Sequence, residues 1–358
     1  MMQPNKILII QTAFLGDLIL TTAFFHQVRK HYPGAQIDVI VNKGTESILS
    51  GSLDIDKVIP LNKKQIKRNI FKFFVFINNL RKESYDLVFC PHFSFRSSII
   101  SWATSAPIRI GYKESGFSFL HTQAISRPRR GPHEVDKLFS LLWDDPSLYP
   151  KGKDRRPIIN LNDSDFGNIS LKLNRNPAET VVLAASSLWE TKRYPEEGFI
   201  GLARSILQKT HYNIILVGSP SDKPLTKNIY QGLLLDRPEW TERILDLAGE
   251  TNLQELAFII SKSRIVISND SSPVHFASAF NIPTLLIYGA TVPEFGYSSL
   301  SDQHIISEIT GLNCRPCGIH GGTFCPVKHF RCMNDQKPDM LFEKFKNLQQ
   351  GILKTSKK

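Results

Sequence analysis

Short apolar runs alternate with segments of helical periodicity, and this alternation limits what the chain can fold into. Residues 7–13 form an apolar run, and residues 18–31 then carry apolar side chains at helical spacing. Residues 37–41 and 85–90 are predicted to be further strands. Strands and helices that alternate at this spacing are typical of a parallel sheet covered on both faces. The first part of the chain is therefore predicted to be an α/β unit.

The same alternation returns in the second half of the chain. Strands are predicted at residues 180–185, 213–218, 264–268 and 284–289, with helical segments between them. Between the two series, residues 144–177 are rich in Pro, Asp, Asn and Lys, and the pattern weakens. Such a stretch is typical of a domain boundary.

The length of 358 residues also favours two domains. We predict an α/β protein with two Rossmann-like domains, at residues 1–165 and 178–338. An amphipathic helix is predicted within residues 339–358.

The chain is basic, with 44 Lys and Arg residues, 33 Asp and Glu residues and a net charge of +11. This surplus suits an anionic partner such as nucleic acid, an anionic lipid or a phosphorylated ligand. Cations and phenylalanines mix over residues 63–76, partly on a helix predicted over residues 66–80, and a second basic group lies at residues 127–130. Each is either an ordinary solvated surface or a region that binds anions.

The compartment is predicted from the lack of a secretory signal and of roughly 20 consecutive apolar residues that could span a bilayer. We expect a cytoplasmic protein, in which cysteines are thiols or metal ligands more often than disulfides. Four of the five cysteines cluster with a histidine, and these ligand types suit zinc, although the spacing is short for a zinc ribbon. Zinc, a packed reduced loop and a labile disulfide all stay open. The residues are Cys314, Cys317, Cys325, His329 and Cys332.

Gly16 and Asp17 stand where the first predicted strand passes into the first helix. Ligands of open parallel sheets bind beyond the carboxyl ends of the strands. Gly16 would permit a tight turn or a close backbone approach. Asp17 is either a helix cap or a general base that faces a bound substrate. No Gly-x-Gly-x-x-Gly follows this strand, which counts against a dinucleotide-dependent dehydrogenase.

Two loops of the second half carry further candidate residues. After the strand at 180–185, the hydroxyls of Ser186 and Ser187 could bind phosphate oxygens. Lys192 or Arg193 could neutralise the charge on a phosphate leaving group, although surface cations in a connecting loop explain them equally well.

The second of these loops follows the strand at 264–268 and opens a helix. Its backbone N–H groups could bind a diphosphate beside Ser271 and Ser272. Asp270 could hold the loop or bind a sugar hydroxyl. His275 is either a binding residue or a packed core histidine.

Seven short motifs, taken in order, resemble glycosyltransferase family 9, the ADP-heptose:lipopolysaccharide heptosyltransferases, and in particular heptosyltransferase II. The resemblance extends from about residue 5 to residue 353. The motifs lie at residues 16–17, 109–112, 133–137, 192–195, 268–275, 288–293 and 314–333.

This resemblance implies a GT-B fold, in which two Rossmann-like domains face each other across an interdomain cleft. The first domain would bind the acceptor and the second the donor, and residues 339–358 would pack back on the first domain. Asp17 would be the base that deprotonates the acceptor hydroxyl, with inversion at the anomeric carbon. Lys192 would contact the donor phosphate. The remaining donor-binding residues would be Gly16, Ser186, Ser187, Arg193, Asp270, Ser271, Ser272 and His275.

The resemblance further implies transfer of a heptose, or a related sugar, from an ADP-sugar to a lipopolysaccharide core. The partners would be the nucleotide-sugar donor and an anionic lipopolysaccharide acceptor at the inner membrane surface, with no nucleic acid. No metal and no cofactor are expected. The basic segment at 63–80 could contact the inner leaflet, or its apolar stripe could simply be core.

The sequence departs from the family pattern at Ser272, where many relatives have Gly, and at residues 289–294. Residues 60–130, which should face the acceptor, match the family least. Another nucleotide-sugar enzyme with the same fold, such as an epimerase or a hydrolase, is therefore an alternative. A basic nucleic-acid-binding protein is a second one.

Overall fold

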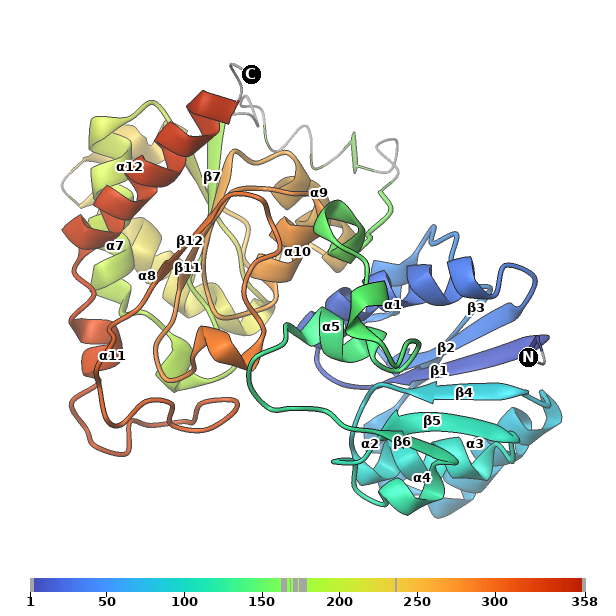
Figure 1. The fold of residues 1–358 in the computed structure, drawn as a ribbon. Helices are drawn as coiled ribbons and strands as arrows, with labels where there is room; N and C mark the ends of the chain where they lie inside the picture. The colour runs from blue at the N-terminus through green and yellow to red at the C-terminus, as the bar shows by residue number, and fades with distance from the viewer. Residues whose placement is uncertain are drawn as a thin grey trace. The chain divides into compact units, whose positions relative to one another are not determined.

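The computed structural model describes residues 3–161, 166, 167, 169, 173, 179–235 and 237–355. The chain divides into two compact units, Met1–Asn160 and Leu161–Lys358, each with its own parallel sheet (Figure 1). The division falls inside the stretch 144–177, where the sequence pattern weakens. The domain limits predicted at residues 165 and 178 lie outside the described residues.

The first unit is built on a six-stranded sheet with the order β3-β2-β1-β4-β5-β6, in which all neighbouring strands are parallel. The central strands are almost entirely buried, as expected for strands covered on both faces. The strands are β1 Lys6–Gln11, β2 Gln36–Asn42, β3 Lys57–Leu61, β4 Leu87–Cys90, β5 Ile108–Tyr112 and β6 Gln123–Ile125.

The helix predicted over residues 18–31 corresponds to α1, the helix predicted over residues 66–80 differs from the structure, and α4 and α5 were not predicted. The helix predicted over residues 66–80 is broken at Asn69, whose backbone is extended and whose side chain accepts a hydrogen bond from the backbone N–H of Lys72 (3.1 Å). Asn69 therefore ends one helix and caps the next. The helices are α1 Leu15–His31, α2 Lys63–Arg68, α3 Ile70–Lys82, α4 Phe95–Ala103 and α5 Glu134–Phe139. Short 3₁₀ turns lie at η1 Glu46–Leu49, η2 Ser118–Leu120, η3 Pro146–Leu148 and η4 Gly152–Arg155.

The second unit repeats this topology, with a parallel sheet in the order β12-β11-β10-β7-β8-β9. Both sheets thus have the doubly wound order of a Rossmann fold. The four predicted strands correspond to β7, β8, β10 and β11, whereas the short edge strands β9 and β12 were not predicted. The strands are β7 Thr180–Ala184, β8 Asn213–Leu216, β9 Ile244–Asp246, β10 Ile265–Asn269, β11 Thr284–Ile287 and β12 His304–Ser307.

The helices of the second unit cover this sheet, and buried side chains of helices and strands together form a core cluster. The helices are α7 Glu196–Lys209, α8 Lys223–Leu234, α9 Leu253–Ser261, α10 Pro273–Ala279, α11 Arg331–Asn334 and α12 Pro338–Thr355. Short 3₁₀ turns lie at η7 Glu190–Lys192, η8 Pro220–Asp222, η9 Pro238–Arg243 and η10 Pro293–Phe295. Among the described residues, no helix is both long and apolar enough to cross a membrane.

The last helix, α12, packs on the helices and strands of the second unit, and the packing of residues 339–358 on the first domain stays a prediction. α12 lies along α7 and contacts β11 and β12 (Figure 1). Leu341 and Phe345 are fully buried in the core cluster of this unit. The Phe345 ring meets the Tyr212 ring edge-on at 5.9 Å between centroids. The apolar face of α12 is therefore satisfied by the helix layer of the second unit.

We predict that Phe345→Ala lowers the free energy of unfolding by about 3–5 kcal/mol, because it leaves a cavity in this core. Leu353→Ala, on the same helix but half exposed, should change it by less than about 0.5 kcal/mol. Urea titration gives the size of the effect, and hydrogen exchange should localise it to the second unit. Lost protection in the first unit alone would contradict the assignment of α12.

Candidate functional site

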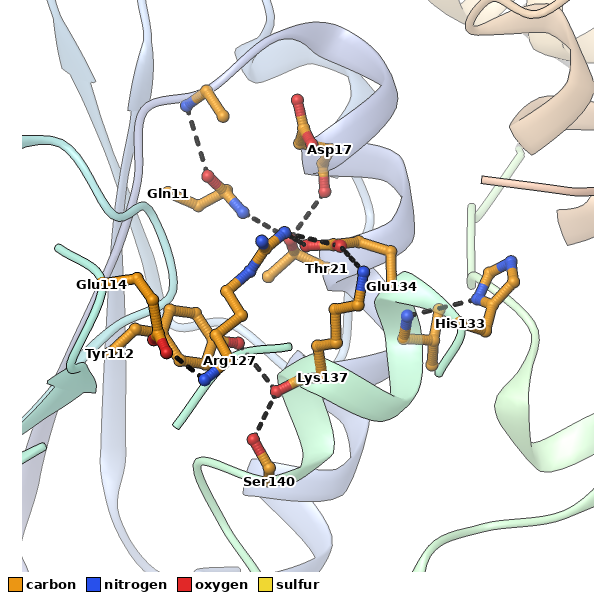
Figure 2. A network of polar contacts seen from close by, with 12 residues as sticks. Gln11, Asp17, Thr21, Tyr112, Glu114, Arg127, His133, Glu134, Lys137 and Ser140 are labelled. Carbon is orange, nitrogen blue, oxygen red and sulfur yellow. Dashed lines mark hydrogen bonds and ion pairs between the residues drawn. The ribbon is translucent and has the colours of Figure 1, made fainter. Parts of the chain in front are cut away.

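Asp17 lies in the first turn of α1, just beyond the carboxyl end of β1. The helix cap is Phe14, so the alternative that Asp17 is the cap residue is wrong. Gly16 lies inside the helix, and the turn expected there falls earlier, at residues 12–14. Asp17 is half-buried, and its carboxylate points away from the hydrogen bond that its own backbone C=O accepts (Figure 2).

Buried polar contacts fix the turn that carries Asp17. The Thr21 hydroxyl donates to the backbone C=O of Asp17 (2.6 Å) and accepts from the side-chain amide of Gln11 (2.7 Å). The other end of that amide, Oε1 of Gln11, accepts from the backbone N–H of Ala13 (3.2 Å). Gln11 therefore ties the end of β1 to the first turn of α1 and holds the carboxylate at the strand end.

Two charged side chains of α5, which packs against α1, form a buried group with Arg127 from the preceding loop. The sequence did not indicate this group. Arg127 Nη2 lies 2.6 Å from both carboxylate oxygens of Glu134, and Lys137 Nζ lies 3.6 Å from one of them (Figure 2). All three side chains are at most 9% exposed. Burial is the main reason why the pKa of Lys137 is lowered. Arg127 is thus part of a buried ion network and not of a solvated basic loop.

In the second unit, Lys192 and Asp270 form a buried ion pair. Lys192 ends η7 after β7, and Asp270 directly follows β10. Their Nζ and Oδ2 atoms are 2.6 Å apart, and the side chains are 14% and 8% exposed. Asp270 Oδ2 also accepts from the Thr291 hydroxyl (2.7 Å). The two predicted loops therefore meet at one cation beyond the carboxyl ends of neighbouring strands.

Asn269, the last residue of β10, holds these two loops together and was not singled out from the sequence. Its amide nitrogen donates to the backbone C=O of Ala185 (2.7 Å). Its amide oxygen accepts from the backbone N–H of Tyr194 (3.0 Å). Asn269 is fully buried, so it acts as a fixed bridge across the loop that carries Lys192. The one sequence feature that could have pointed to Asn269 is its position inside the motif at residues 268–275.

Ser186, Ser187 and Arg193 belong to the same loop after β7 as Lys192. Ser186 is half-buried and Ser187 is buried. Arg193 donates from Nε to the C=O of Ser187 (2.7 Å) and pairs with Glu190 (2.8 Å). These contacts hold the loop, and a part for Arg193 in donor binding stays a prediction.

The start of α10 supplies the remaining predicted residues. Ser272 occupies the cap position, and its C=O accepts from the backbone N–H of His275 (2.9 Å). The Ser271 and Ser268 hydroxyls are 3.2 Å apart. The His275 side chain is buried, and its ring lies 6.2 Å from the Tyr297 ring. His275 is therefore packed, and its place in a binding site stays a prediction.

The cysteine segment, residues 314–333, bonds the residues next to Lys192 and Asp270's partner Thr291, which the sequence did not indicate. The backbone N–H of Gly322 donates to the Thr191 hydroxyl (2.8 Å). Arg315 donates to the C=O of Thr291 (2.7 Å), and the backbone N–H of Cys317 to that of Ala290 (2.8 Å). The segment thus holds the residues next to Lys192 and the residue that bonds Asp270.

The thiols of this segment are free, as are all five cysteines of the chain. Cys314 Sγ lies 3.8 Å from Nε2 of His329, and burial raises the pKa of Cys332 to about 11. Within the described ranges, no three His, Cys, Asp or Glu side chains are grouped so that they could hold a metal ion.

Comparisons with known proteins agree with the fold. The model of glycosyltransferase family 9 (heptosyltransferase) matches residues 73–322. Lipopolysaccharide heptosyltransferase 2 of Escherichia coli is 23% identical over 320 residues, which cover 86% of this chain and 89% of that relative. The solved structure of E. coli ADP-heptose lps heptosyltransferase II matches with a TM-score of 0.78 at 22% identity, over 96% of this chain and 98% of that one.

A second solved structure, E. coli heptosyltransferase WaaC with ADP-2-deoxy-2-fluoro heptose, matches with a TM-score of 0.69 at 17% identity. It covers 96% of this chain and 99% of that one. Likenesses at these identities concern the fold. The predicted α/β architecture of the GT-B class, with two parallel-sheet units, is confirmed.

We predict that Lys192→Ala destabilises the protein by about 3 kcal/mol, because it leaves the Asp270 carboxylate buried without its cation. Adding Asp270→Asn should restore part of this loss, so that the pair couples by more than about 1 kcal/mol in a double-mutant cycle. Urea unfolding measures each free energy. The exposed pair Arg237–Glu239 is the control and should show coupling of less than about 1 kcal/mol. Additive effects at Lys192 and Asp270 would contradict the pairing.

Proposed function

Because the chain belongs to glycosyltransferase family 9, we propose that it transfers a heptose, or a related sugar, from an ADP-sugar donor to a lipopolysaccharide core. The observation that carries the proposal is that the buried centre of the second unit lies inside the matched residues. Lys192, Asp270 and Thr291 all fall between residues 73 and 322. The family inferred from the motifs is confirmed, and its members are glycosyltransferases.

On the donor side, the second unit would bind the nucleotide sugar. Lys192 is the natural partner for the diphosphate, because the leaving group gains negative charge as the glycosidic bond breaks. Asp270 holds the ammonium at the carboxyl edge of the sheet, and the Thr291 hydroxyl donates to the same carboxylate. Ser186, Ser187, Ser271 and Ser272 would offer hydroxyl and backbone donors around the phosphates, beside Arg193 and His275. We propose that this cation takes the part that a metal ion would play, so that transfer is metal-independent.

On the acceptor side, the first unit would bind the sugar that is extended. The acceptor hydroxyl oxygen attacks the anomeric carbon while the bond from that carbon to the diphosphate oxygen breaks. Its proton passes to the Asp17 carboxylate, and the ADP leaves with the bonding electron pair. A single displacement of this kind inverts the anomeric configuration. Asp17 lies before the residues matched by the family model, so its role rests on its place at the end of β1.

The acceptor fits the charge of the chain. A lipopolysaccharide core is anionic, and the chain carries a net charge of +11. We propose that the protein meets this acceptor at the cytoplasmic surface of the inner membrane.

We predict that Asp17→Asn lowers kcat by about 10²- to 10⁴-fold, because the amide keeps the shape of the side chain but cannot accept the proton. ADP affinity should not change, because the donor is bound by the second unit. Release of ADP in the presence of acceptor measures the rate. Asp144→Asn, at an exposed carboxylate of the same unit, is the control. An unchanged kcat would remove Asp17 from the mechanism.

We also predict that the protein binds ADP in preference to UDP, GDP or CMP, and that Lys192→Ala weakens this binding about tenfold or more, since a charge-assisted contact to the diphosphate is lost. Calorimetry with each nucleotide, with and without a chelator, provides the test. Lys227→Ala, at an exposed lysine of the second unit, should behave like the wild type. Preference for UDP or GDP would exclude an ADP-sugar donor. Binding abolished by the chelator would contradict the proposed metal independence.

A further inference from the structure

The segment from residue 62 to residue 82 is unusual in charge. It contains seven Lys and Arg residues and no Asp or Glu, although acidic residues are common in the rest of the chain. This segment comprises α2 and α3 of the first unit. The cations are Lys63, Lys64, Lys67, Arg68, Lys72, Arg81 and Lys82.

The outer side of α3 carries exposed apolar side chains among its polar ones, which is unusual for a surface helix. Its inner face packs on the core of the first unit through side chains such as Ile77 and Leu80. Three further apolar side chains point outward instead: Phe71 is 77% exposed, Phe74 is 62% exposed and Val75 is 60% exposed. They lie at helix positions i, i+3 and i+4, so they form one face. Only part of the apolar stripe on this helix is therefore core.

Two hollows are lined by residues of α2 and α3, and both include cations in their lining. The first, of about 480 Å³, lies at the junction of α2 and α3 and is lined by polar side chains that include Lys64, Arg68 and Lys72. The second, of about 220 Å³, is lined mainly by apolar side chains of α2, α3 and α4, with Lys63 and Arg96 among them. Burial and the neighbouring Arg96 lower the pKa of Lys63, as expected where two cations share a site without an anion.

We infer that the surface formed by α2, α3 and these two hollows docks the protein on an anionic phospholipid bilayer. Anionic headgroups would occupy the cationic hollows, and Phe71, Phe74 and Val75 would enter the boundary between headgroups and acyl chains. Bulky apolar side chains interleaved with cations suit this boundary. The inference extends the proposed function, because it names the surface that meets the membrane carrying the acceptor.

A second copy of the chain suits this surface less well than a bilayer. In a symmetric dimer the same patch would face itself, so the cations of one copy would lie against those of the other with no acidic residue between them. A bilayer supplies the missing negative charge together with an apolar layer. The chemistry of the patch therefore favours lipid.

The place of the surface in the first unit also suits the chemistry. α2 follows β3 directly, and Asp17 follows β1, so both lie at the carboxyl edge of the same sheet. The Lys63 ammonium donates to the backbone C=O of Thr12, in the turn that leads to Asp17. Docking through α2 and α3 would therefore bring a membrane-held acceptor to the edge that carries Asp17.

Co-sedimentation with vesicles tests the inference. The wild type should bind vesicles that contain phosphatidylglycerol and should bind pure phosphatidylcholine vesicles about tenfold less tightly, with added salt removing the difference. Phe71→Ser with Phe74→Ser, and separately Lys64→Gln with Lys72→Gln, should each weaken binding about tenfold or more. Leu53→Ser and Lys30→Gln are matched controls, because both side chains are exposed on the first unit outside this surface.

The other outcomes are equally informative. Equal binding of the variants and the wild type, or binding that does not depend on anionic lipid, would overturn the inference. Light scattering that shows a dimer abolished by Phe71→Ser with Phe74→Ser would assign the surface to self-association instead. ADP calorimetry on the same variants separates the two proposals. Variants that still bind ADP but no longer bind vesicles would support docking through this surface. A wild type that binds ADP but does not prefer anionic vesicles would overturn the docking inference and leave the proposed function standing.

Discussion

The ion pair between Lys192 and Asp270 is the interaction around which the second unit arranges its loops. Both side chains are largely buried, and such charges are stable only when they are paired and hydrogen-bonded. The loop after β7, the end of β10 and the Thr291 hydroxyl meet this requirement, and the cysteine segment, residues 314–333, bonds the neighbouring Thr191 and the backbone of Thr291. A cation prepared in this way needs little reorganisation when a diphosphate leaves, and this is the condition for electrostatic catalysis.

The first unit uses the same sheet topology for a different task. Gln11 and Thr21 fix the turn that presents Asp17, and a carboxylate rather than a cation stands at the strand end. Two groups of cations stand out in this unit: Arg127 and Lys137 in the buried network with Glu134, and the lysines and arginines of α2 and α3. In the proposed mechanism the two units would divide the chemistry of glycosyl transfer. The first unit would supply a proton acceptor, and the second would supply positive charge for the leaving group.

The sequence predicts the elements whose pattern is local. The buried central strands are continuous apolar runs, and the loops that follow them carry the candidate residues, so the places of Asp17, Lys192 and Asp270 could be foreseen. It does not predict which core a helix joins. The apolar face of α12 is visible in the sequence, but its partner is α7, which lies more than a hundred residues earlier.

The sequence also does not predict contacts between segments that are far apart along the chain. Glu134 and Lys137 are neighbours on one helix, whereas the partner Arg127 lies in a loop that reads as solvated. The cysteine segment suggests a metal site by composition, yet its backbone contacts with Thr191 and Ala290 depend on folding. The sequence does not distinguish the exposed Phe71 and Phe74 from core residues, because apolar residues lie on both the inner and the outer side of α3.

The most direct test of the central claim is mass spectrometry of a lipopolysaccharide core acceptor lacking its outer heptoses, after incubation with the protein and ADP-heptose. The account predicts that the acceptor gains the mass of one heptose residue for each ADP released, with the anomeric configuration inverted. ADP released at full rate without any change in the acceptor would identify a hydrolase and would contradict the account.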